Sequence, residues 1–431
     1  MIIKLKNGAT FNSITDNSKQ CNKTTAFILT HQNRNYIDSV TCKVITPADC
    51  LDILGIKKSI KIIGVTGTNG KTTTAAAIYS ILLDLDKKVA FQGTRGYFVN
   101  EERRGEKSLT TPPILQTIAN LKDAQSDGCE YFIMEVSSHA IKQKRIEGLE
   151  FYLKIFTNIT QDHLDYHGNI DSYVSVKSSF FDDETLKLIN KDDKKIRFNK
   201  KNCVTYGVEN PSTYKVVAYT LKDGTSAVLQ KIDKTYNFYS PLHGLFNIYN
   251  ILAALSAVDM LQIVPLKETC KAIENFAGVE GRMEIVSSKP LVIVDFAHTP
   301  DGMDKVFDAF KDRDIIVVFG AGGDRDRDKR EKMGNIANKY AKKIVLTSDN
   351  PRGENPNLII KDIAVGIKNT DSLYIEVDRK EAIKYALHVR CDHEIVLILG
   401  KGDETYQEFK EKKIPFDDRN IVRELLKIQS F

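Results

Sequence analysis

The stretch best suited to chemistry is "GVTGTNGKTTT", residues 64–74, which combines three glycines with a lysine and a run of threonines. A glycine-rich loop that follows a strand and opens a helix can hold a polyphosphate with its backbone N–H groups. Lys71 would supply a positive charge to the outer phosphates, and Thr72 a hydroxyl to magnesium. The spacing is unusual, because Val65 stands where the motif GxxxxGK[ST] has its first glycine. An ordinary strand-to-helix turn is the alternative, but the Gly-Lys-Thr-Thr run favours nucleotide binding.

Further polar side chains follow two predicted strands. "EVSSHAIKQKR" begins at the end of the first strand, and its polar residues at or past that end are Glu135, Ser137, His139, Gln143 and Arg145. Glu135 could bind magnesium, although a solvated carboxylate is equally compatible with the pattern. "NITQDHLDYHG" follows the next strand and holds His163, Asp165 and His167, whose spacing is not that of a zinc site. Taken singly, each histidine is expected to be structural.

A lone arginine stands in "SDNPRGENP", residues 348–356. The Asp, Asn and Pro residues around it are typical of a turn, and Asn355-Pro356 is typical of a helix start. Turn formation does not explain Arg352, whose planar guanidinium is suited to binding a carboxylate with two parallel hydrogen bonds. We therefore treat Arg352 as a candidate ligand-binding residue.

A GTPase is an alternative from another class of protein. "NKDD" at residues 190–193 matches the guanine-binding NKxD motif. Four such residues recur by chance in a chain rich in Lys, Asp and Asn, and no switch motif is convincing between this stretch and the phosphate loop. Nucleotide preference would separate the two functions.

These residues require an α/β scaffold with parallel sheets. Residues 1–58 show no strong periodicity, and strands alternating with helices follow. In the central part we expect strands at 61–67, 129–138 and 149–159, helices at 71–85 and 246–261, and antiparallel hairpins around an Asp-Gly turn at 214–240. Residues 274–286 are expected to form a linker. Beyond it we expect five strands, at 291–296, 314–322, 342–348, 372–377 and 394–400, with helices at 331–341 and 379–389. The predicted domains are 1–58, 59–279 and 280–431, the last a doubly wound sheet with ligand loops at the carboxyl ends of its strands.

Composition narrows the class of protein further. The 431 residues, 42% hydrophobic, are enough for two or three domains. Seven scattered cysteines without a CxxC pair indicate neither a disulfide framework nor a zinc site, and they suit a cytoplasmic protein. We find no apolar run long enough to span a membrane and no leader, so we expect a soluble, unprocessed chain. A net charge of +5 suits anionic small molecules but is too small to indicate nucleic-acid binding.

Taken together, the motifs resemble those of the Mur ligases of peptidoglycan synthesis, and among them the branch that adds the third residue of the stem peptide. The resemblance runs from about residue 11 to the C-terminus and is carried, in order, by "GVTGTNGKTTT", "LTTPP", "EVSSHAIKQKR", "NITQDHLDYHG", "FNIYNILAA", "GRME", "DFAHTPDGM", "GGDRDRDKR", "DNPRGENP" and "GKGDETYQ". It implies a small N-terminal α/β UDP-binding domain, a central P-loop ATPase-like parallel sheet with an antiparallel insert, and a C-terminal Rossmann-like domain that binds an amino acid.

The resemblance also implies a reaction. ATP would phosphorylate the D-glutamate carboxylate of UDP-N-acetylmuramoyl-L-alanyl-D-glutamate, and an amine would attack the acyl phosphate to leave an amide, ADP and phosphate. Lys177 matches the lysine that these enzymes carbamylate with CO2. A carbamate turns a cation into an anion that could join a magnesium site. The family also implies a monomer with small-molecule substrates.

Site residues are implied motif by motif. Those for ATP are Gly67, Thr68, Asn69, Gly70, Lys71, Thr72, Thr73, Asn247, Asn250, Arg282, Asp295 and His298. Those for magnesium are Thr72, Glu135, His163 and Lys177, and with Lys71 the last three form the catalytic set. Those for the UDP-linked peptide are Ser18, His31, Gln32, Asn33, Thr110, Thr111, Ser137, Gln143 and Arg145. Those for the amino acid are Arg325, Asp349, Asn350, Pro351, Arg352, Gly400 and Glu404.

The amino acid implied by "DNPR" is meso-diaminopimelate, because relatives without this arginine use L-lysine, which lacks the distal carboxylate. A lysine-adding enzyme remains an alternative, as do a ligase adding D-alanyl-D-alanine and a folylpolyglutamate synthase. The chain departs from the family pattern at Phe296, where tyrosine is common, and at Asp403, where histidine is common. Its N-terminal domain is also short, which makes the UDP contacts the least firmly based.

Overall fold

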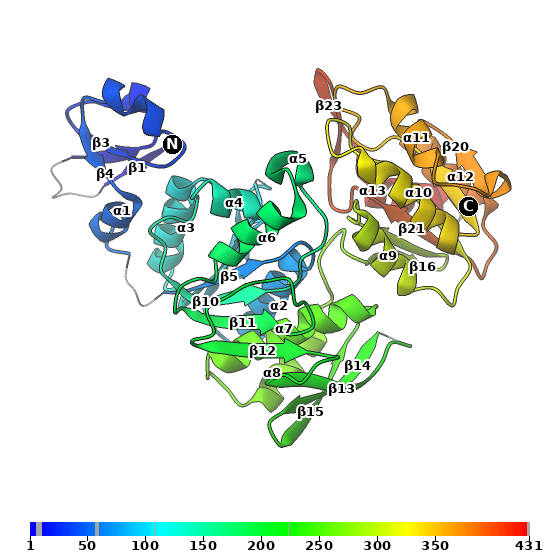
Figure 1. Cartoon of the computed structure of the whole chain (residues 1–431), viewed down its shortest axis with the longest axis horizontal. Coiled ribbons are helices and arrows are strands. Elements are labelled where there is room, and N and C mark those ends of the chain that lie inside the picture. Colours follow the sequence, from blue (N-terminus) through cyan, green and yellow to red (C-terminus); the bar gives the residue numbers. More distant parts are fainter. Residues whose placement is uncertain (6–10, 57–59, 108, 223, 429–431) are drawn as a thin grey trace.

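The computed structural model describes residues 1–5, 11–56, 60–107, 109–222 and 224–428. Its main sheets follow one another along the chain, as predicted for a mixed α/β protein of several domains (Figure 1). We propose the domain limits given above. The first limit falls among residues 57–59, which lie outside the described residues. Asp223 of the predicted Asp-Gly turn also lies outside them.

The N-terminal sheet has the order β1-β2-β3-β4. Its strands are β1 (Ile2–Lys4), β2 (Ser13–Thr15), β3 (Thr25–Ile28) and β4 (Lys43–Ile45), accompanied by the 3-10 helices η1 (Ser18–Gln20) and η2 (Arg34–Ser39) and by α1 (Pro47–Ile53). Helix α1 starts at a capping box, in which Thr46 and Asp49 bond each other's backbone N–H. The core of this sheet includes Ile114 and Ile118 of the central domain.

The central sheet has the order β15-β14-β13-β12-β11-β10-β5-β9-β6-β7-β8. Its strands are β5 (Lys61–Thr66), β6 (Val89–Gly93), β7 (Gly96–Val99), β8 (Glu102–Gly105), β9 (Tyr131–Glu135), β10 (Phe151–Phe156), β11 (Leu186–Asn190), β12 (Cys203–Gly207), β13 (Tyr214–Thr220), β14 (Thr225–Lys231) and β15 (Lys234–Ser240). Strands β6, β9, β5 and β10 are parallel neighbours, and β13 to β15 form the predicted antiparallel insert. Strands β6 to β8 were not predicted from the sequence. They are short, and the pairing of β7 with β8 contains a register shift.

Two helices cover the central strands and form the core with them. The helices of this domain are α2 (Lys71–Asp84), α3 (Ile114–Ser126), α4 (Ser138–Lys142), α5 (Leu164–His167), α6 (Ile170–Ser179), α7 (Leu245–Met260), α8 (Leu266–Ala272) and the 3-10 helix η3 (Ile273–Asn275). Residues 75–77 of α2 are three alanines, and all are buried in one cluster with residues of α7. Small side chains let the two helices approach closely, so the start of α2 is fixed relative to α7.

The C-terminal sheet has the order β16-β17-β21-β18-β19-β20. Its strands are β16 (Glu284–Ser288), β17 (Leu291–Asp295), β18 (Ile315–Phe319), β19 (Lys343–Leu346), β20 (Leu373–Ile375) and β21 (Ile395–Leu399), and a separate hairpin is formed by β22 (Tyr406–Phe409) and β23 (Lys412–Pro415). The helices are α9 (Pro300–Asp308), α10 (Asp328–Tyr340), α11 (Pro356–Ala364), α12 (Arg379–Val389) and α13 (Asp418–Ile428), with η4 (Thr370–Ser372).

The C-terminal sheet corrects two predictions. The five predicted strands are present, but β16 adds an antiparallel edge strand, so the end of the predicted linker 274–286 is part of the sheet. Its half-exposed residues lack the apolar run that marks the buried strands. The hairpin β22–β23 was not predicted, because both strands are only four residues long and mix polar with apolar residues.

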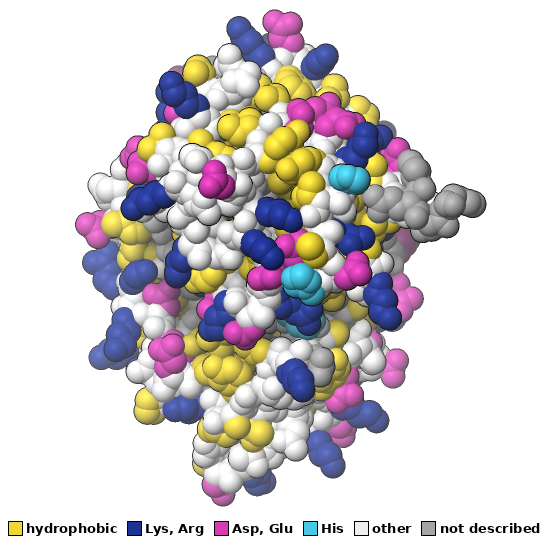
Figure 2. Space-filling view, turned by 90° about the vertical axis from the view of Figure 1, so that its right-hand side faces the viewer, with side chains coloured by type: hydrophobic (Ala, Val, Ile, Leu, Met, Phe, Trp, Pro, Cys, Tyr) yellow, Lys and Arg dark blue, Asp and Glu magenta, His cyan; other side chains and the backbone are white. Residues whose placement is uncertain are grey.

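Helix length and surface charge indicate whether a membrane or a nucleic acid is a plausible partner. In the described part of the chain, no helix has both the length and the apolar content needed to cross a membrane. Figure 2 shows acidic and basic side chains interspersed on the face that includes the C-terminal side of the molecule. Interspersed charge suits small-molecule chemistry in a cleft better than binding to a long polyanion.

Candidate active site

A cavity of about 1160 Å³ lies between the central and C-terminal domains. It is formed where the carboxyl ends of β5, β9 and β10 face loops at the carboxyl ends of β17, β18, β19 and β21. Its walls bring together twenty of the predicted residues: Thr68, Asn69, Gly70, Lys71, Thr72, Thr73, Thr110, Glu135, His163, Asn247, Asn250, Arg282, Asp295, His298, Arg325, Asp349, Asn350, Arg352, Gly400 and Glu404. Residues from all four predicted ligand sets therefore share one cavity, although Thr110 is the only member of the UDP-linked peptide set among them.

The phosphate loop is shaped by close contacts that require glycine. Gly67 has φ +154° and packs so tightly that a Cβ would lie 1.8 Å from Thr157 Oγ1. Gly70, with φ +83°, leaves room for the side chain of Asn250, whose Oδ1 would be 2.2 Å from a Cβ. Helix α2 begins at the next residue, so its free N–H groups point toward the cavity. Lys71 Nζ donates to carbonyl oxygens of this loop, at 2.9 Å and 2.8 Å.

A buried carboxylate lies next to the loop. Glu135, at the end of β9, accepts hydrogen bonds from Thr72 Oγ1 at 2.8 Å and from Thr94 N–H at 2.8 Å. Burial raises the pKa of this carboxyl, and Lys71 acts in the opposite direction. A hydroxyl and a carboxylate in contact at a phosphate-binding loop are hard oxygen ligands of the kind that Mg²⁺ prefers. The pair therefore fits a magnesium site.

Lys177 is a fully buried amine beneath the phosphate loop. It lies on α6, and its Nζ donates to Gly67 O at 2.8 Å and to Thr66 Oγ1 at 3.2 Å. Burial, with a smaller contribution from the charge of Lys71, lowers the pKa of Lys177 well below its ordinary value. A neutral amine is the form that reacts with CO2, so this environment fits the implied carbamate. Gly67 belongs to the loop that would hold the phosphates, and Thr66 is the last residue of the strand before it.

The histidines form a cluster beside the same loop. His163 lines the cavity and lies 3.4 Å from Asp162 through its Nε2. The ring of His139 is 4.8 Å from that of His163 and stacks on Tyr166 at 4.1 Å. Burial lowers the pKa of His163 to about 4, which keeps the imidazole neutral near pH 7, the state required of a metal ligand. Asp162 lines the cavity as well and was not predicted from the sequence.

The residues implied for the UDP-linked peptide form a hydrogen-bonded network behind Glu135. Thr111 Oγ1 donates to Glu135 O and accepts from Ser137 N–H, both at 2.9 Å. Arg145 donates to Thr111 O at 2.9 Å and to Gln143 Oε1 at 2.6 Å. Gln32 of the N-terminal domain donates to the same Gln143 oxygen at 2.9 Å, which joins two domains at this point.

The other N-terminal residues implied for the UDP-linked peptide differ in how far their side chains are exposed to a ligand. His31 is exposed and Ser18 is half-buried at the start of η1. Asn33 is buried, and its amide donates to Ile28 O at 2.9 Å and accepts from Thr30 N–H at 2.8 Å. The side chain of Asn33 therefore closes its own loop, and we propose that it shapes the site instead of contacting the ligand.

Several residues implied for ATP hold the cavity wall together. Asn250 Nδ2 donates to Asn247 Oδ1 at 3.0 Å, and Asn250 packs against the phosphate loop. The carboxylate of Asp295 accepts from Met283 N–H and from Ala297 N–H, both at 2.7 Å. The guanidinium of Arg282 lies 4.1 Å above the ring of Phe296, one of the two departures from the family pattern.

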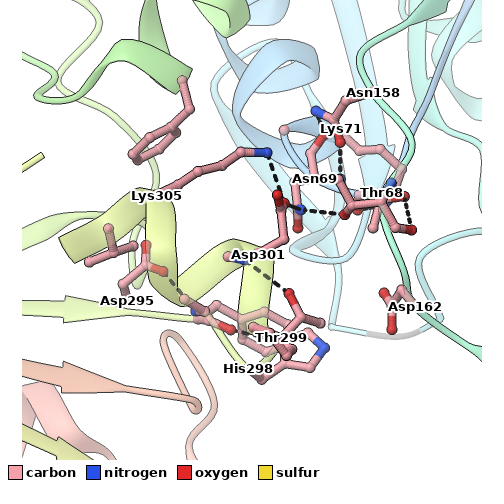
Figure 3. A pocket seen from close by; sticks show the side chains of 18 of the residues that line it. Thr68, Asn69, Lys71, Asn158, Asp162, Asp295, His298, Thr299, Asp301 and Lys305 are labelled. Atoms are coloured by element: carbon pink, nitrogen blue, oxygen red, sulfur yellow. Dashed lines mark hydrogen bonds and ion pairs between the residues drawn. The ribbon is translucent and has the colours of Figure 1, made fainter. Parts of the chain in front are cut away.

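A direct contact between the domains was missed by the sequence analysis. Figure 3 shows Asp301, from α9, reaching toward the phosphate loop. Its Oδ2 accepts from Asn69 Nδ2 at 3.0 Å and from Lys305 Nζ at 2.8 Å. Asp301 stands inside the quoted "DFAHTPDGM", so its motif carried a signal, but its partner is 232 residues away in the chain.

The far end of the cavity holds the residues implied for the amino acid. Asn350 Nδ2 donates to Glu404 Oε2 at 2.8 Å, and Lys401 Nζ donates to the same oxygen at 2.9 Å. Arg352 Nε donates to Glu408 Oε2 at 3.0 Å, and its NH1 donates to Gly323 O at 2.8 Å. Arg352 was expected to bind a ligand carboxylate. In the structure its Nε already binds a carboxylate of the chain, that of Glu408. Arg325 is exposed at the rim, and buried Pro351 lies outside the cavity wall.

The "NKDD" stretch has structural partners, which does not favour guanine binding. Asn190 Nδ2 donates to Thr157 O at 2.7 Å, and Asp193 accepts from Ile159 N–H at 2.6 Å. Asp192 accepts from three consecutive backbone N–H groups at residues 208–210, at 2.7 to 2.9 Å. Burial acts to raise the pKa of Asp192, but these hydrogen bonds outweigh it and hold the pKa at about 2.

Asp192→Ala is expected to lower the free energy of unfolding by about 2 kcal/mol at pH 7, because three backbone donors lose a charged acceptor. A depressed folded-state pKa stabilises the protein above the unfolded value of about 3.9, and this contribution disappears as the pH falls toward 2. Urea unfolding of both proteins at pH 7 and pH 3 measures the difference, which should shrink at the lower pH. Asp182→Ala, at an exposed position nearby, is the control. Equal stability of the wild type and Asp192→Ala at pH 7 would contradict the structural role.

The sequence matches two described families along most of its length. Residues 65–258 match the Mur ligase middle domain, and residues 281–402 match the Mur ligase, glutamate ligase domain. A Wolinella succinogenes protein named UDP-N-acetylmuramoyl-L-alanyl-D-glutamate--2,6-diaminopimelate ligase is 53% identical over 413 residues, covering 95% of each chain. The Helicobacter pylori protein of the same name is 49% identical over 96% of this chain and 94% of its own.

Solved structures share the architecture. A UDP-N-acetylmuramoyl-L-alanyl-D-glutamate--2,6-diaminopimelate ligase superposes with a TM-score of 0.68 at 28% identity, covering 97% of this chain and 95% of its own. A Mycobacterium tuberculosis folylpolyglutamate synthase, complexed with ADP and AMPPCP, reaches a TM-score of 0.67 at 17% identity, over 82% of this chain and 91% of its own, which shows a common fold alone. With about half of all residues identical to two curated relatives across nearly the whole chain, the chain belongs to the Mur ligase family.

Proposed function

We propose that this chain is an ATP-dependent amide ligase that joins meso-diaminopimelate to the D-glutamate carboxylate of UDP-N-acetylmuramoyl-L-alanyl-D-glutamate in peptidoglycan synthesis. One observation carries the proposal. A single cavity has a phosphate loop at one end and, at the other, an arginine and a glutamate able to receive a carboxylate and an ammonium group. The names of relatives about half identical to this chain agree with it.

The first step takes place at the phosphate loop. Residues 67–73 hold the ATP phosphates with backbone N–H groups, and the Lys71 ammonium neutralises charge on them. The D-glutamate γ-carboxylate oxygen attacks the γ-phosphorus, ADP leaves, and an acyl phosphate forms. Thr111, Ser137, Gln143 and Arg145 orient the nucleotide-linked peptide, since their network ends directly behind Glu135.

Thr72, Glu135, His163 and a carbamylated Lys177 are the residues that would hold magnesium, which when bound offsets the negative charge that builds up during phosphoryl transfer. The fit rests on the buried contact between Thr72 and Glu135 and on the burial of Lys177, which lowers the pKa of its amine. Carbamylation would give Lys177 an anionic oxygen pair in place of its amine. Because Lys177 Nζ donates to Gly67 O, a carbamate formed there would lie against the phosphate loop.

The second step takes place where the two domains meet. The C-terminal pocket holds the amino acid so that its reacting amine faces the acyl carbon. Nitrogen attacks this carbon, the bond to the phosphate oxygen breaks, and the ammonium proton is released as the amide forms. Holding both reactants in one cavity lowers the barrier, because the reacting groups no longer have to be brought together from solution.

Nucleotide hydrolysis coupled to the amine tests this function. Phosphate release should require ATP, the UDP-linked dipeptide and meso-diaminopimelate together, and each omission should reduce it to background. GTP should replace ATP poorly. Turnover with GTP alone, independent of the amine, would overturn the proposal and restore the GTPase alternative.

An ion pair between domains yields a further prediction. Lys107, which follows β8, lies 2.7 Å from Asp403 Oδ2 and also donates to the Asp403 carbonyl oxygen. Asp403 is adjacent to Glu404, so the pair ties the amino-acid pocket to the central domain. Lys107→Met is expected to lower kcat/KM for diaminopimelate about tenfold, because it leaves a buried carboxylate unpaired.

Steady-state kinetics at low and high salt measure this effect, which should be smaller at high salt because salt already weakens the wild-type ion pair. Arg103→Met is a matched control, since Arg103 lies on the same hairpin and pairs with exposed Glu106. The role of the pair is wrong if Lys107→Met and Arg103→Met have the same kinetics as the wild type.

We place the enzyme in the cytoplasm and propose that it acts as a monomer. Seven cysteines without a disulfide among the described residues suit a reducing compartment.

A further inference from the structure

The guanidinium of Arg352 hydrogen-bonds Glu408, a residue that belongs to none of the motifs or predicted ligand sets. Glu408, on β22, accepts the Arg352 Nε hydrogen bond at 3.0 Å. The two residues are 56 positions apart. Arg352 lines the cavity, whereas Glu408 is absent from the residues found in its walls. The contact therefore lies on the side of the guanidinium away from the ligand space.

Other contacts join strand β22, which contains Glu408, to the loop of residues 349–352. The backbone N–H of Arg352 donates to Glu408 O at 3.0 Å, and Glu408 N–H donates to Asn350 Oδ1 at 2.9 Å. Gln407 Nε2 donates to Asp349 O at 3.0 Å. Arg352 itself has φ +48°, a left-handed conformation that is uncommon for a residue with a side chain. Strand β22 therefore fixes the backbone as well as the side chain of Arg352.

The contacts leave part of the guanidinium for a ligand. Arginine has five N–H hydrogens in a rigid planar fork. Nε is used by Glu408, and one NH1 hydrogen is used by Gly323 O at 2.8 Å. Gly322 lies beside the same group, where a Cβ would be 2.9 Å from Arg352 NH1. Among the described residues, no hydrogen bond is recorded for NH2. Glu408 and Gly323 hold the guanidinium at Nε and NH1, and the NH2 hydrogens are left to meet a second carboxylate.

We propose that Glu408 is a positioning residue for amino-acid specificity, which orients Arg352 so that its remaining N–H groups meet the distal carboxylate of diaminopimelate. The inference rests on the proposed function of the pocket. A free arginine side chain would have to lose rotamer freedom on binding the ligand, and that loss is avoided when the guanidinium is held in advance. Glu408 would thus act through Arg352 without touching the substrate.

The test compares Glu408→Gln with the wild type. An amide keeps the size of the side chain but replaces the ion pair with one neutral acceptor. We expect KM for diaminopimelate to rise about tenfold, while kcat and KM for ATP stay within about twofold. KM for L-lysine, which has no distal carboxylate, should not change. Glu408→Asp retains the charge on a shorter side chain. Its KM for diaminopimelate should lie between those of the wild type and Glu408→Gln.

A double-mutant cycle separates positioning from general damage. In an Arg352→Met background, Glu408→Gln should have no further effect on KM for diaminopimelate, because the residue through which it acts is gone. Glu411→Gln, at an exposed position in the turn of the same hairpin, is the matched control and should behave as the wild type. Thermal unfolding of every variant checks that the hairpin remains folded.

Three outcomes would overturn the inference. A fall in KM for diaminopimelate would mean that Glu408 competes with the ligand for Arg352. An equal rise in KM for diaminopimelate and L-lysine would mean that the hairpin shapes the whole pocket. A full effect in the Arg352→Met background would mean that Glu408 acts by another route. Absence of diaminopimelate turnover in the wild type would instead refute the proposed function, and this role with it.

Discussion

Lys177→Met is expected to reduce ligation by about 10³-fold or more, because it removes both the buried amine and any carbamate formed on it. Methionine keeps the length and most of the volume of the side chain, so the fold should remain. The effect should appear in kcat, since Lys177 lies under Gly67 of the phosphate loop and would act on the phosphoryl-transfer step. Steady-state phosphate release with all substrates measures the loss.

The chain offers a matched control for this variant. Lys187 is also fully buried in the central domain, and its Nζ donates to two backbone carbonyls, at 2.9 Å and 3.0 Å. Lys187→Met should cost stability without comparable loss of kcat in the folded protein. A ¹³C-carbonate experiment should give a carbamate signal in the wild type that Lys177→Met lacks, and added bicarbonate should restore nothing in that variant. Substantial activity of Lys177→Met would show the carbamate assignment to be wrong.

Arg352→Met is expected to lower kcat/KM for diaminopimelate by about 10³-fold and to leave the low turnover with L-lysine nearly unchanged. A site that pairs a carboxylate favours the ligand that has one, because only that ligand gains the charge-assisted hydrogen bonds of the arginine. Removing the arginine removes that difference, so the preference for diaminopimelate over lysine should largely disappear. Competition between the two amino acids in one reaction, followed by mass spectrometry of the products, measures the ratio directly.

Arg327→Met is the control for Arg352→Met. Arg327 is exposed, lies 2.9 Å from Glu354 of the same loop, and is outside the cavity wall. Its substitution should leave the preference intact. Equal turnover of diaminopimelate and L-lysine by the wild type, unaffected by Arg352→Met, would mean that Arg352 serves the turn and that the lysine-adding alternative deserves priority.

The fold was predictable where burial dominates the sequence. Strands β5, β10, β18 and β21 are apolar runs buried on both faces, so their residues alone indicate them. Strand β16 and the hairpin β22–β23 are short, mostly half-buried or exposed, and mix polar with apolar residues. Edge elements of this kind carry little local signal.

The site was predictable where a motif is local. The phosphate loop and "DNPR" could be recognised because their residues are contiguous in the chain. Three contacts could not be predicted, because each joins segments far apart in sequence. They are Asp301 with Asn69, Glu408 with Arg352, and Asp403 with Lys107. The ligand roles implied for Asn33 and Asp295 remain predictions. The side chain of each hydrogen-bonds backbone groups, which the sequence alone did not indicate.

The central claim is that ATP activates the substrate carboxylate and that the amine then displaces phosphate. Its most direct test uses UDP-linked dipeptide labelled with ¹⁸O in the D-glutamate γ-carboxylate, with ATP and meso-diaminopimelate. Mass spectrometry of the inorganic phosphate should find one ¹⁸O per molecule formed, because the carboxylate oxygen that attacked phosphorus leaves with it. Unlabelled phosphate, with oxygen taken from water, would show that ATP cleavage is not coupled to amide formation and would contradict the account.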